Sequence, residues 1–543
     1  MKRFISYLLI ICLLFGMSGC TSETATPGTS GTTQPDNAVK GEYVVQGVGT
    51  PVTVEGNDRV FYQVFVGSFS DSNGDGIGDL RGMINRFDYL NDGDDNSGKS
   101  LGVEGIWLNP IFLSPSYHKY DTMDYYAIDH RFGTEADLRE LIQLCHERNV
   151  KIILDLVINH TSTHHSWFDQ FCNAHKNNDT SSPYYDFYTY ADKPVAGRTF
   201  NPISGSAHYY ECNFSGDMPE LNFDNELVRQ EMVALAKTYL DMGVDGFRFD
   251  AAKYIYYGEE SKNAEFWDWY MGKLREIKPD IYSVAEVWDA DPATMPYFTS
   301  TNCFNFSMSQ QNGQIAKAAR GGKASTLIYY MEQYLAQIKE KNPNAMPVSF
   351  ITNHDMDRAA GFLTTQTGDA YMAANLSILL PGSTFIYYGE EIGMLGSRGG
   401  ASTDANRRMA MLWGDADTVK DPTGTNYKGE QVNGTVADQL GRADSLYNHY
   451  KKVIAIRKAN PEIAKGAFIP LDVKNPKAGG FLSTLDGKSV AVIHNTTAEP
   501  VEIDLSKIAD LPCKNLTSFV GRGDVTLNGT ILTIGAKTTA ILR

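Results

Sequence analysis

The feature that most constrains this chain is a repeated alternation of short apolar segments with amphipathic helical segments, beginning near Asp58. Such βα units build parallel sheets, because each strand is followed by a helix that returns the chain to the same edge. The predicted strands are Val60–Val66, Val103–Leu108, Lys151–Ile158, Gly243–Phe249, Ile281–Ala285, Cys303–Phe306, Pro347–Thr352 and Thr384–Tyr388. Eight strands close a parallel sheet, so the predicted fold is an α/β (β/α)8 TIM barrel.

Two of the predicted helices carry terminal signals. Thr134 can cap a helix whose apolar residues recur every three or four positions as far as Cys145. A second helix is predicted from Asn225 to Met242, with Gly243 at its C-terminal end. Both helices follow predicted strands, as the barrel requires.

Two segments depart from the barrel pattern. Residues 161–222, rich in Tyr, Asn, Asp and Gly, are predicted to form a domain inserted after the third strand. Residues 461–543 show a β-type pattern and are predicted to form an antiparallel β-sandwich. The predicted strands of this sandwich are Ser489–His494, Val501–Leu505, Thr530–Ile534 and Thr538–Leu542. The catalytic barrel would then occupy residues 57–160 and 223–460.

The N-terminus reads as a targeting segment. In residues 1–20, Lys2 and Arg3 precede an apolar run, and small residues lead to Cys20. This run is too short to remain as a membrane anchor and is typical of a secretory signal. Its Met-Ser-Gly-Cys ending resembles a bacterial lipobox, which implies lipidation of Cys20. Residues 21–56 are predicted to be a flexible tether, so we expect a secreted protein lipid-anchored to the outside of a bacterial membrane.

Charge and cysteine content exclude some partners. The chain has 65 acidic and 48 basic residues, and a formal net charge of −17 argues against nucleic acid, because neutralising phosphates needs a basic face. The cysteines form no CxxC pair and show no zinc spacing. Cys172 and Cys212 could pair or remain free thiols. We expect a monomer that contacts the membrane only through the lipid on Cys20.

Three predicted strands end in a carboxylic acid. The segment Val244–Asp250 alternates, so that Arg248 and Asp250 face the barrel axis. Glu286 ends the next strand, and Asp355 follows His354 two strands later. Chemistry in (β/α) barrels is carried out at the C-terminal ends of the strands. Clustered like charges cost stability, so a common site explains these three acids better than folding does.

A pair of carboxylates flanking a bond is what glycosidic cleavage needs, one as proton donor and the other as nucleophile or base. Arg248, on the same strand face as Asp250, would keep that carboxylate ionised and able to attack. Glu286 would need a raised pKa to remain a proton donor near neutral pH.

Four segments carry a resemblance to a known family. Asp155–His160, Gly246–Asp250, Ala285–Trp288 and Thr352–Asp355 resemble, in the same order, the four signature segments of the α-amylase family of retaining glycoside hydrolases. The resemblance covers about residues 58–540. It implies a catalytic barrel, a domain inserted after the third strand, a C-terminal β-domain and an α-glucan as the substrate.

The resemblance also implies roles for individual residues. Asp250 would be the nucleophile, Glu286 the acid/base and Asp355 a stabiliser of the transition state. The implied substrate-binding residues are Tyr120, Asp155, His160, Arg248, Lys253, His354 and Arg358. Among these, Tyr120 would lie under the sugar at the cleavage point, and Asp155 would support the site.

An acidic loop suggests a cofactor. Residues 71–79 place oxygen side chains at alternate positions between glycines, and hard oxygen ligands at this density suit Ca²⁺, although a solvated acidic turn is the alternative. The predicted ligands are Asp71, Asn73, Asp75 and Asp79 with the carbonyl of Ile77. The loop resembles a metal loop of some α-amylase relatives. A second calcium site, also implied by the resemblance, would use Asn159, Glu220 and Tyr254.

The expected function is that of an α-amylase, an endo-acting hydrolase of α-1,4-glucans that works by retaining double displacement. The segment Met218–Asn222 resembles members intermediate between oligo-1,6-glucosidases and neopullulanases, whereas Lys253 resembles α-amylases. The alternatives are a neopullulanase or oligo-1,6-glucosidase, a 4-α-glucanotransferase, and a non-catalytic starch-binding surface lipoprotein.

Overall fold

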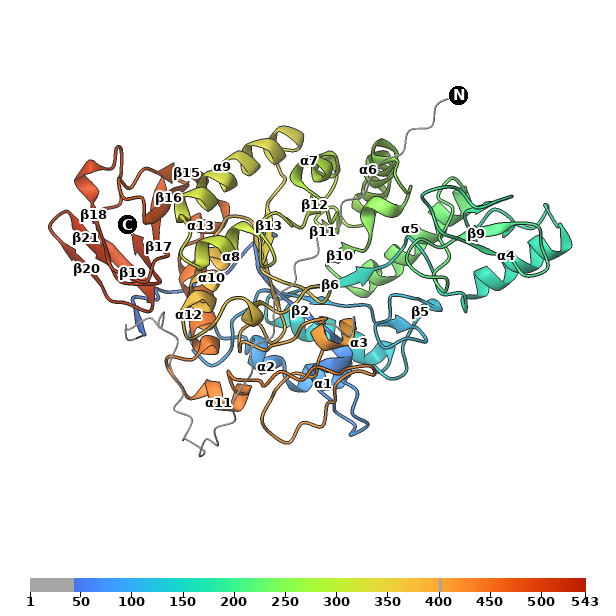
Figure 1. Ribbon diagram of the computed structural model, residues 1–543, viewed down its shortest axis with the longest axis horizontal. Coiled ribbons are helices and arrows are strands. Elements are labelled where there is room, and N and C mark those ends of the chain that lie inside the picture. Colours follow the sequence, from blue (N-terminus) through green and yellow to red (C-terminus); the bar gives the residue numbers. More distant parts are fainter. Residues whose placement is uncertain (1–42, 400–402) are drawn as a thin grey trace, which may run out of the picture. The chain divides into compact units, whose positions relative to one another are not determined.

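The predicted barrel is confirmed by the structure, a computed structural model that describes residues 43–399 and 403–543. The eight strands are parallel and lie in the order β12-β11-β10-β6-β3-β2-β14-β13. In Figure 1 the labelled strands of this sheet, among them β2, β6 and β10, lie in the middle of the molecule. Their bounds are β2 Val60–Val64, β3 Gly105–Leu108, β6 Lys151–Leu156, β10 Gly246–Phe249, β11 Tyr282–Ala285, β12 Asn302–Cys303, β13 Val348–Phe350 and β14 Ser383–Tyr387. A parallel bridge between Phe304 and Val348 joins the two ends of the sheet and nearly closes it.

The helices surround the sheet, and both predicted terminal signals are confirmed. Thr134 forms a capping box at the start of α3 (Glu135–Glu147). Asn225 caps α5 (Glu226–Met242), which ends at Gly243 in the left-handed conformation. The other helices that follow barrel strands are α1 Leu80–Asn85, α2 Phe87–Leu90, α6 Glu260–Ile277, α7 Asp291–Thr294, α8 Gln314–Ala319, α9 Ala324–Lys341, α10 Asp369–Ile378, α11 Val436–Leu440, α12 Leu446–Ala459 and α13 Glu462–Lys465.

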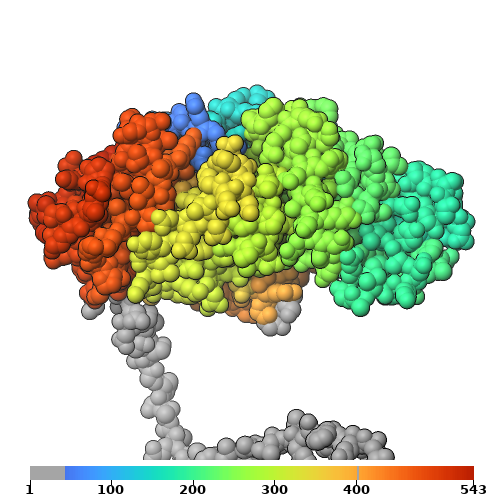
Figure 2. All heavy atoms as spheres, turned by 90° about the horizontal axis from the view of Figure 1, so that it is seen from above, coloured from blue at the N-terminus to red at the C-terminus, as the bar shows by residue number. Residues whose placement is uncertain are grey.

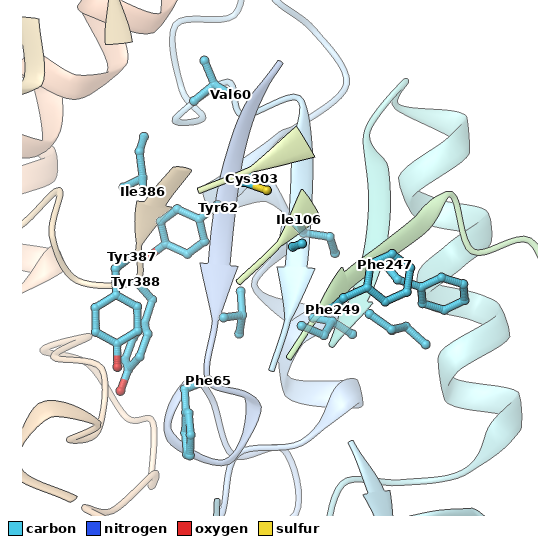
Figure 3. Packing of buried hydrophobic residues seen from close by; sticks show 14 of the residues in the cluster. Val60, Tyr62, Phe65, Ile106, Phe247, Phe249, Cys303, Ile386, Tyr387 and Tyr388 are labelled. Atoms are coloured by element: carbon cyan, nitrogen blue, oxygen red, sulfur yellow. The ribbon is translucent and has the colours of Figure 1, made fainter. Parts of the chain in front are cut away.

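Alternation along β10 orients its side chains as the sequence predicts. Phe249 packs on the rings of Trp267 and Tyr270 in α6, with ring centroids 4.7 and 5.9 Å away. Figure 3 shows Phe247 and Phe249 among the buried side chains that line the strands. With these two rings committed to the helices, Arg248 is left on the barrel side of the strand.

Two excursions from the barrel shape the region beyond the strand ends. A hairpin of β4 (Phe112–Leu113) and β5 (Asp124–Ile128) follows β3. Between β6 and α5 the chain forms α4 (Ser166–Asn177) and a small antiparallel sheet of β7 (Tyr190–Ala191), β9 (Tyr209–Glu211) and β8 (Phe200–Pro202). Cys172 and Cys212 lie in this segment and are both free, so the pairing that the sequence allowed is not formed.

The C-terminal region consists of two antiparallel sheets packed face to face around their own apolar core. The larger sheet has the order β1-β19-β22-β17-β16-β15, and the smaller one β18-β21-β20. Figure 2 shows this region in direct contact with the part of the barrel that carries α9, and α9 contacts β15 and β16. The bounds are β1 Val44–Gln46, β15 Ala467–Leu471, β16 Ala478–Leu485, β17 Lys488–Asn495, β18 Val501–Asp504, β19 Leu516–Gly521, β20 Val525–Asn528, β21 Ile531–Ile534 and β22 Thr538–Leu542.

One prediction about the N-terminal segment is wrong at its C-terminal end. The tether was expected to extend to residue 56, but Val44–Gln46 form β1 and pair with β19. The β-branched valines suit an edge strand, and the partner strand lies too far along the chain for a local pattern to indicate it. The predicted signal segment, Cys20 and the rest of the tether as far as residue 42 lie outside the described residues. Within the described residues, every helix is too short or too polar to span a bilayer.

Candidate functional site

The C-terminal ends of β6, β10 and β11 bring three carboxylates together around one arginine. Arg248 is completely buried, and its Nη1 donates to Asp155 Oδ1 (2.7 Å) and to Asp250 Oδ1 (2.5 Å). Its Nη2 lies 3.0 Å from Glu286 Oε1. The guanidinium therefore contacts both members of the predicted catalytic pair. The hydrogen bonds from Nη1 to Asp155 and Asp250 are charge-assisted and therefore stronger than neutral ones, whereas the contact between Nη2 and Glu286 is a short approach without hydrogen-bond geometry.

One positive charge does not compensate three carboxylates, of which those of Asp155 and Asp250 are buried and that of Glu286 is 12% exposed. The pKa of Glu286 is raised to about 8, chiefly by burial and also by the charges of Asp250 and Asp355, against the opposing effect of Arg248. Burial likewise raises the pKa of Asp155 to about 7, in spite of the contact with Arg248. Glu286 therefore retains its proton near neutral pH, as a general acid must.

The backbone between the catalytic pair adopts an uncommon conformation. Ala251, directly after Asp250, has φ of 48°, in the left-handed region that non-glycine residues seldom occupy. Its N–H group lies 3.3 Å from Glu286 Oε2 and donates to it. The conformation thus directs a backbone donor at the second oxygen of the acid, and such strain often accompanies a functional site.

Asp355 lines the same cleft as Asp250 and Glu286, and its carboxylate contacts Arg408 and His354. Arg408 Nη2 donates to Asp355 Oδ1 (2.6 Å), and His354 Nε2 is 3.0 Å from Asp355 Oδ2. Because Gln63 Nε2 donates to His354 Nδ1, the proton of a neutral His354 lies on Nε2, facing Asp355. Burial alone would raise the pKa of Asp355, but His354 and Arg408 outweigh burial and hold it well below its usual range.

Tyr120 connects Asp155, a partner of Arg248, with His354, a partner of Asp355. Its hydroxyl donates to Asp155 Oδ2 (2.9 Å), accepts from Asn109 Nδ2 (2.9 Å) and lies 2.6 Å from His354 Nε2. Its ring is parallel to the imidazole of His354, with an interplanar angle of 3°. The loop between β4 and β5 carries Tyr120. This ring is therefore fixed in the floor of the mouth before any ligand binds.

The predicted residues surround a cleft with a volume of about 600 Å³. His160 lines it, and Nε2 of His160 is buried without a hydrogen-bond partner in residues 43–399 and 403–543. Burial lowers the pKa of His160, so the ring is neutral and free to bond a ligand hydroxyl. Lys253 lines the same cleft while its Nζ donates to the carbonyl of Trp288 (2.8 Å).

Four of the predicted substrate-binding residues do not line this cleft. Asp155 and Arg248 are buried in the cluster described above. His354 has no exposed surface and contacts Tyr120 and Asp355 from below the cleft. Arg358 is buried, donates to the carbonyl of Tyr388 (2.6 Å) and borders a second hollow of about 470 Å³. This hollow shares only Trp288 and Asp355 with the first, so the cleft continues past these two residues.

Several cleft residues were missed by sequence reasoning. Arg408 lies in the long loop after β14, which has no periodic pattern that would have indicated its contact with Asp355. Phe214 and Met218 reach the cleft from the inserted segment. Trp288 ends the signature segment Ala285–Trp288, and His118 is two residues from Tyr120, so their proximity to predicted residues was the only indication in the sequence.

The predicted calcium loop is ordered by its own backbone. The Asp71 carboxylate accepts from the amides of Asn73, Gly74 and Gly76 and from the Thr418 hydroxyl (2.6 Å). Burial opposes ionisation, but these donors lower the pKa of Asp71. The oxygen-only donor set is of the class that Ca²⁺ binds. However, no group of three His, Cys, Asp or Glu side chains converges as a metal cage anywhere in the described parts of the chain.

The residues of the second predicted calcium site have other partners. Glu220 Oε1 accepts from the backbone N–H of Asn213 (2.9 Å), and burial together with Glu211 raises the pKa of Glu220 to about 8. The Asn159 amide lies 3.3 Å from His160 Nδ1. The ring of Tyr254 lines the cleft. This site stays a prediction.

Fold and site together define a class of protein. A parallel (β/α)8 barrel that gathers buried acids of differing pKa around a cleft at the C-terminal ends of its strands is the arrangement of a barrel glycoside hydrolase.

Comparisons with known proteins identify the family. The family model described as "Alpha amylase, catalytic domain" matches residues 63–466. The chain is 37% identical to "Alpha-amylase 3" of Dictyoglomus thermophilum, covering 81% of this chain and 84% of that protein. It is 31% identical to a 4-alpha-glucanotransferase of Thermotoga maritima, covering 81% and 96% respectively. The solved structure of Eubacterium rectale Amy13B superposes with a TM-score of 0.85 at 34% identity, covering 91% of this chain and 97% of the other. The chain therefore belongs to the α-amylase family and is a glycoside hydrolase of amylase type.

Proposed function

We propose that this protein is an α-amylase that cleaves internal α-1,4-glucosidic bonds of starch and maltodextrins with retention of configuration. The observation that carries the proposal is the contact of one buried guanidinium with both Asp250 and Glu286. This contact supports a site in which both carboxylates flank one glycosidic bond, and the raised pKa of Glu286 supports its role as the proton donor. The 37% identity to a protein named an α-amylase supports the same substrate class.

In the proposed mechanism, Glu286 donates its proton to the leaving glycosidic oxygen while Asp250 attacks the anomeric carbon and forms a glycosyl ester. Glu286, now a carboxylate, removes a proton from water, whose oxygen attacks the anomeric carbon and releases Asp250. Asp355, held anionic by Arg408, would bind sugar hydroxyls more tightly as positive charge develops on the ring. Arg248 limits the repulsion between the neighbouring carboxylates.

Two hollows that both border Asp355 support endo action. The first hollow receives residues from the inserted segment, whereas the second is lined by residues that follow β11, β12, β13 and β14. A glucan chain that passes through both hollows would not need a free end at the cleavage point. The test is a 4-nitrophenyl maltoheptaoside whose non-reducing end is blocked. Its rapid cleavage is expected, and resistance to cleavage together with activity on the unblocked compound would indicate an exo-glucosidase instead.

The pH dependence of activity should report the proton on Glu286. Because the pKa of Glu286 is raised to about 8, the acid is present below this value and lost above it. We expect kcat/KM on maltoheptaose to fall about tenfold per pH unit above about pH 8. Burial also raises the pKa of Glu390 to about 8, but Glu390 bonds to Tyr450 away from the cleft, so Glu390→Gln should leave this limb in place. A basic limb whose midpoint lies below pH 6 would contradict the assignment.

A 4-α-glucanotransferase is the second candidate, because one relative carries that name at 31% identity. Both enzymes share the first step, and they differ in whether water or a sugar hydroxyl attacks the glycosyl ester. Incubation with maltotriose separates them. Glucose and maltose alone indicate hydrolysis, and chains longer than maltotriose indicate transfer.

We also propose that residues 71–79 bind Ca²⁺, using oxygens of Asp71, Asn73, Asp75 and Asp79 with the Ile77 carbonyl. The proposal is supported by the alternating oxygen donors and the anionic state of Asp71. When bound, the ion would supply charge compensation and rigidity to this loop. No step of the reaction is assigned to it.

Removal of calcium should then lower thermal stability. A ligand at about 100 times its Kd stabilises a fold by about 2.7 kcal/mol, so EDTA should lower the apparent Tm by a few degrees at fixed scan rate. Asp75→Asn should abolish the effect of EDTA. The matched control is Asp94→Asn in a second acidic turn, where Asp94 accepts from the N–H of Asn96, and this variant should keep the EDTA effect. Equal melting with and without EDTA in the unaltered protein would overturn the proposal.

For cellular location, we propose export and lipid anchoring through Cys20, supported by the lipobox-like sequence alone. Attack on a polymer outside the cell fits such an anchor.

A further inference from the structure

Two histidine rings of the inserted segment point one nitrogen at each other. His175 lies in the last turn of α4, and His208 directly precedes β9. Their Nδ1 atoms are 2.9 Å apart, and the ring planes are nearly perpendicular, with an interplanar angle of 82°. Neither residue lines the catalytic cleft. The pair therefore lies outside the proposed mechanism.

The other nitrogen of each ring faces an acceptor. His175 Nε2 is 2.9 Å from the carbonyl oxygen of Tyr185, which places the proton of a neutral His175 on Nε2. His208 Nε2 is 3.4 Å from a carboxylate oxygen of Asp192, which favours a proton on that nitrogen too. Ser206 Oγ accepts from the backbone N–H of His208 and lies 3.2 Å from His208 Nδ1, so its own proton can point at Nδ1. In two neutral rings, these partners leave a lone pair on each Nδ1, and the two lone pairs face each other.

A cation between the rings resolves this conflict. Two lone pairs 2.9 Å apart repel each other unless a proton or a metal ion lies between them. A carbonyl or carboxylate that accepts from the far N–H of each ring is the arrangement that usually orients histidines toward a metal. Burial lowers the pKa of His175, and the neutral ring is the form that binds a metal. At Zn–N distances of about 2.0–2.1 Å, two tetrahedral ligand atoms lie about 3.3 Å apart, so the rings would need to separate by only about 0.4 Å.

The pair has one fixed ring and one accessible ring. His175 has no exposed surface, and its ring stacks on Tyr185 with centroids 4.1 Å apart. The side chain of His208 is 19% exposed, and that of Asp192 is 91% exposed. An ion can therefore enter from the side of His208 and reach a nitrogen that is already oriented.

We infer that His175 and His208 bind a Zn²⁺ ion through their Nδ1 atoms, with the Ser206 hydroxyl and water at the remaining positions. The ion would join the end of α4 to the start of β9 and so stabilise the inserted segment, with no step in the glycosidic reaction. A structural zinc site usually has four protein ligands, whereas this one has two histidines, so its ion exchanges with the solvent and zinc must be supplied. Calcium removal from residues 71–79 is therefore a separate measurement.

The test adds Zn²⁺ to the full chain after EDTA treatment, desalting and return to a buffer with saturating Ca²⁺. Isothermal titration should give one Zn²⁺ per chain, and saturating Zn²⁺ should raise the apparent Tm by a few degrees. His208→Ala should abolish both signals, because it removes one of the two ligands. Asp192→Asn should weaken zinc affinity at least tenfold, since the acceptor that orients His208 is lost. His164→Ala, which alters an exposed histidine of the same segment, is the matched control and should bind zinc as the unaltered protein does.

Two results would overturn the inference. If Zn²⁺ gives neither binding heat nor a shift in the Tm of the unaltered protein, a shared proton is what joins the rings. If one Zn²⁺ per chain still binds to His208→Ala with unchanged affinity, the ion lies elsewhere. A melt of each variant without zinc shows whether it is folded, and if His208→Ala is not, the affinity of Asp192→Asn decides. Cleavage of the blocked maltoheptaoside is measured without zinc, so failure of the amylase proposal and failure of the zinc site are distinguishable.

Discussion

Asp250→Asn is expected to lower kcat on amylose by about 10⁴-fold or more, with little loss of folding. The carboxylate is the proposed nucleophile, and an amide of the same shape neither attacks the anomeric carbon nor carries the charge that Arg248 contacts. Reducing-sugar release measures the loss. The control is Asp241→Asn, at the exposed end of α5, where Asp241 pairs with Lys237 and activity should be unchanged.

Azide distinguishes a lost nucleophile from a general disturbance of the site. In Asp250→Ala, azide can enter the space of the missing side chain and attack from the face opposite the leaving oxygen, which yields a β-glycosyl azide from an α-glucan. Unchanged reducing-sugar release from Asp250→Asn would show that the mechanism is wrong. If Asp250→Ala is folded and inactive but azide gives no glycosyl azide, Asp250 is not the nucleophile.

Glu286→Gln is expected to lower kcat on amylose about 10²–10⁴-fold, the usual contribution of general acid–base catalysis. Glutamine cannot donate a proton to the leaving oxygen, although it can still occupy the place beside Arg248. The loss should be much smaller with α-maltosyl fluoride, because fluoride leaves without a proton. The basic limb near pH 8 should also disappear, since its proton is the one that Glu286 carries.

The same azide experiment gives the opposite stereochemistry here. In Glu286→Ala the glycosyl ester on Asp250 still forms from the fluoride, and azide then attacks from the α face to give an α-glycosyl azide. A β product from Glu286→Ala, or equal losses on amylose and on the fluoride, would contradict the division of roles between the two acids.

The strand-end acids could be predicted because their signal is local. In β10, apolar and polar residues alternate, which places Phe249 toward α6 and Arg248 toward the barrel interior. The closure of eight such strands then brings Asp250 and Glu286 to one mouth, since parallel strands end at the same face. The capping of α3 by Thr134 was readable for the same reason, because the capping residue and its partner are three residues apart.

Contacts between distant segments could not be predicted in this way. Arg408 reaches Asp355 from an irregular loop, and β1 pairs with β19 across almost the whole chain. The residues next to Arg408 and Val44 in the sequence carry no pattern that would indicate Asp355 or β19 as the partner. The contact between Phe214 and Tyr254 could not be predicted either, because it follows from where the inserted segment meets the barrel.

The sequence by itself therefore determined the order of strands and helices, the positions of the acids at strand ends and the family. The tertiary structure decided the raised pKa of Glu286, the hydrogen bond from Arg408 to Asp355 and the exposure of Phe214. The physical reason is that periodicity and capping act over a few residues of chain. Burial and electrostatic interactions instead depend on distances in space, which exist only once the barrel has closed.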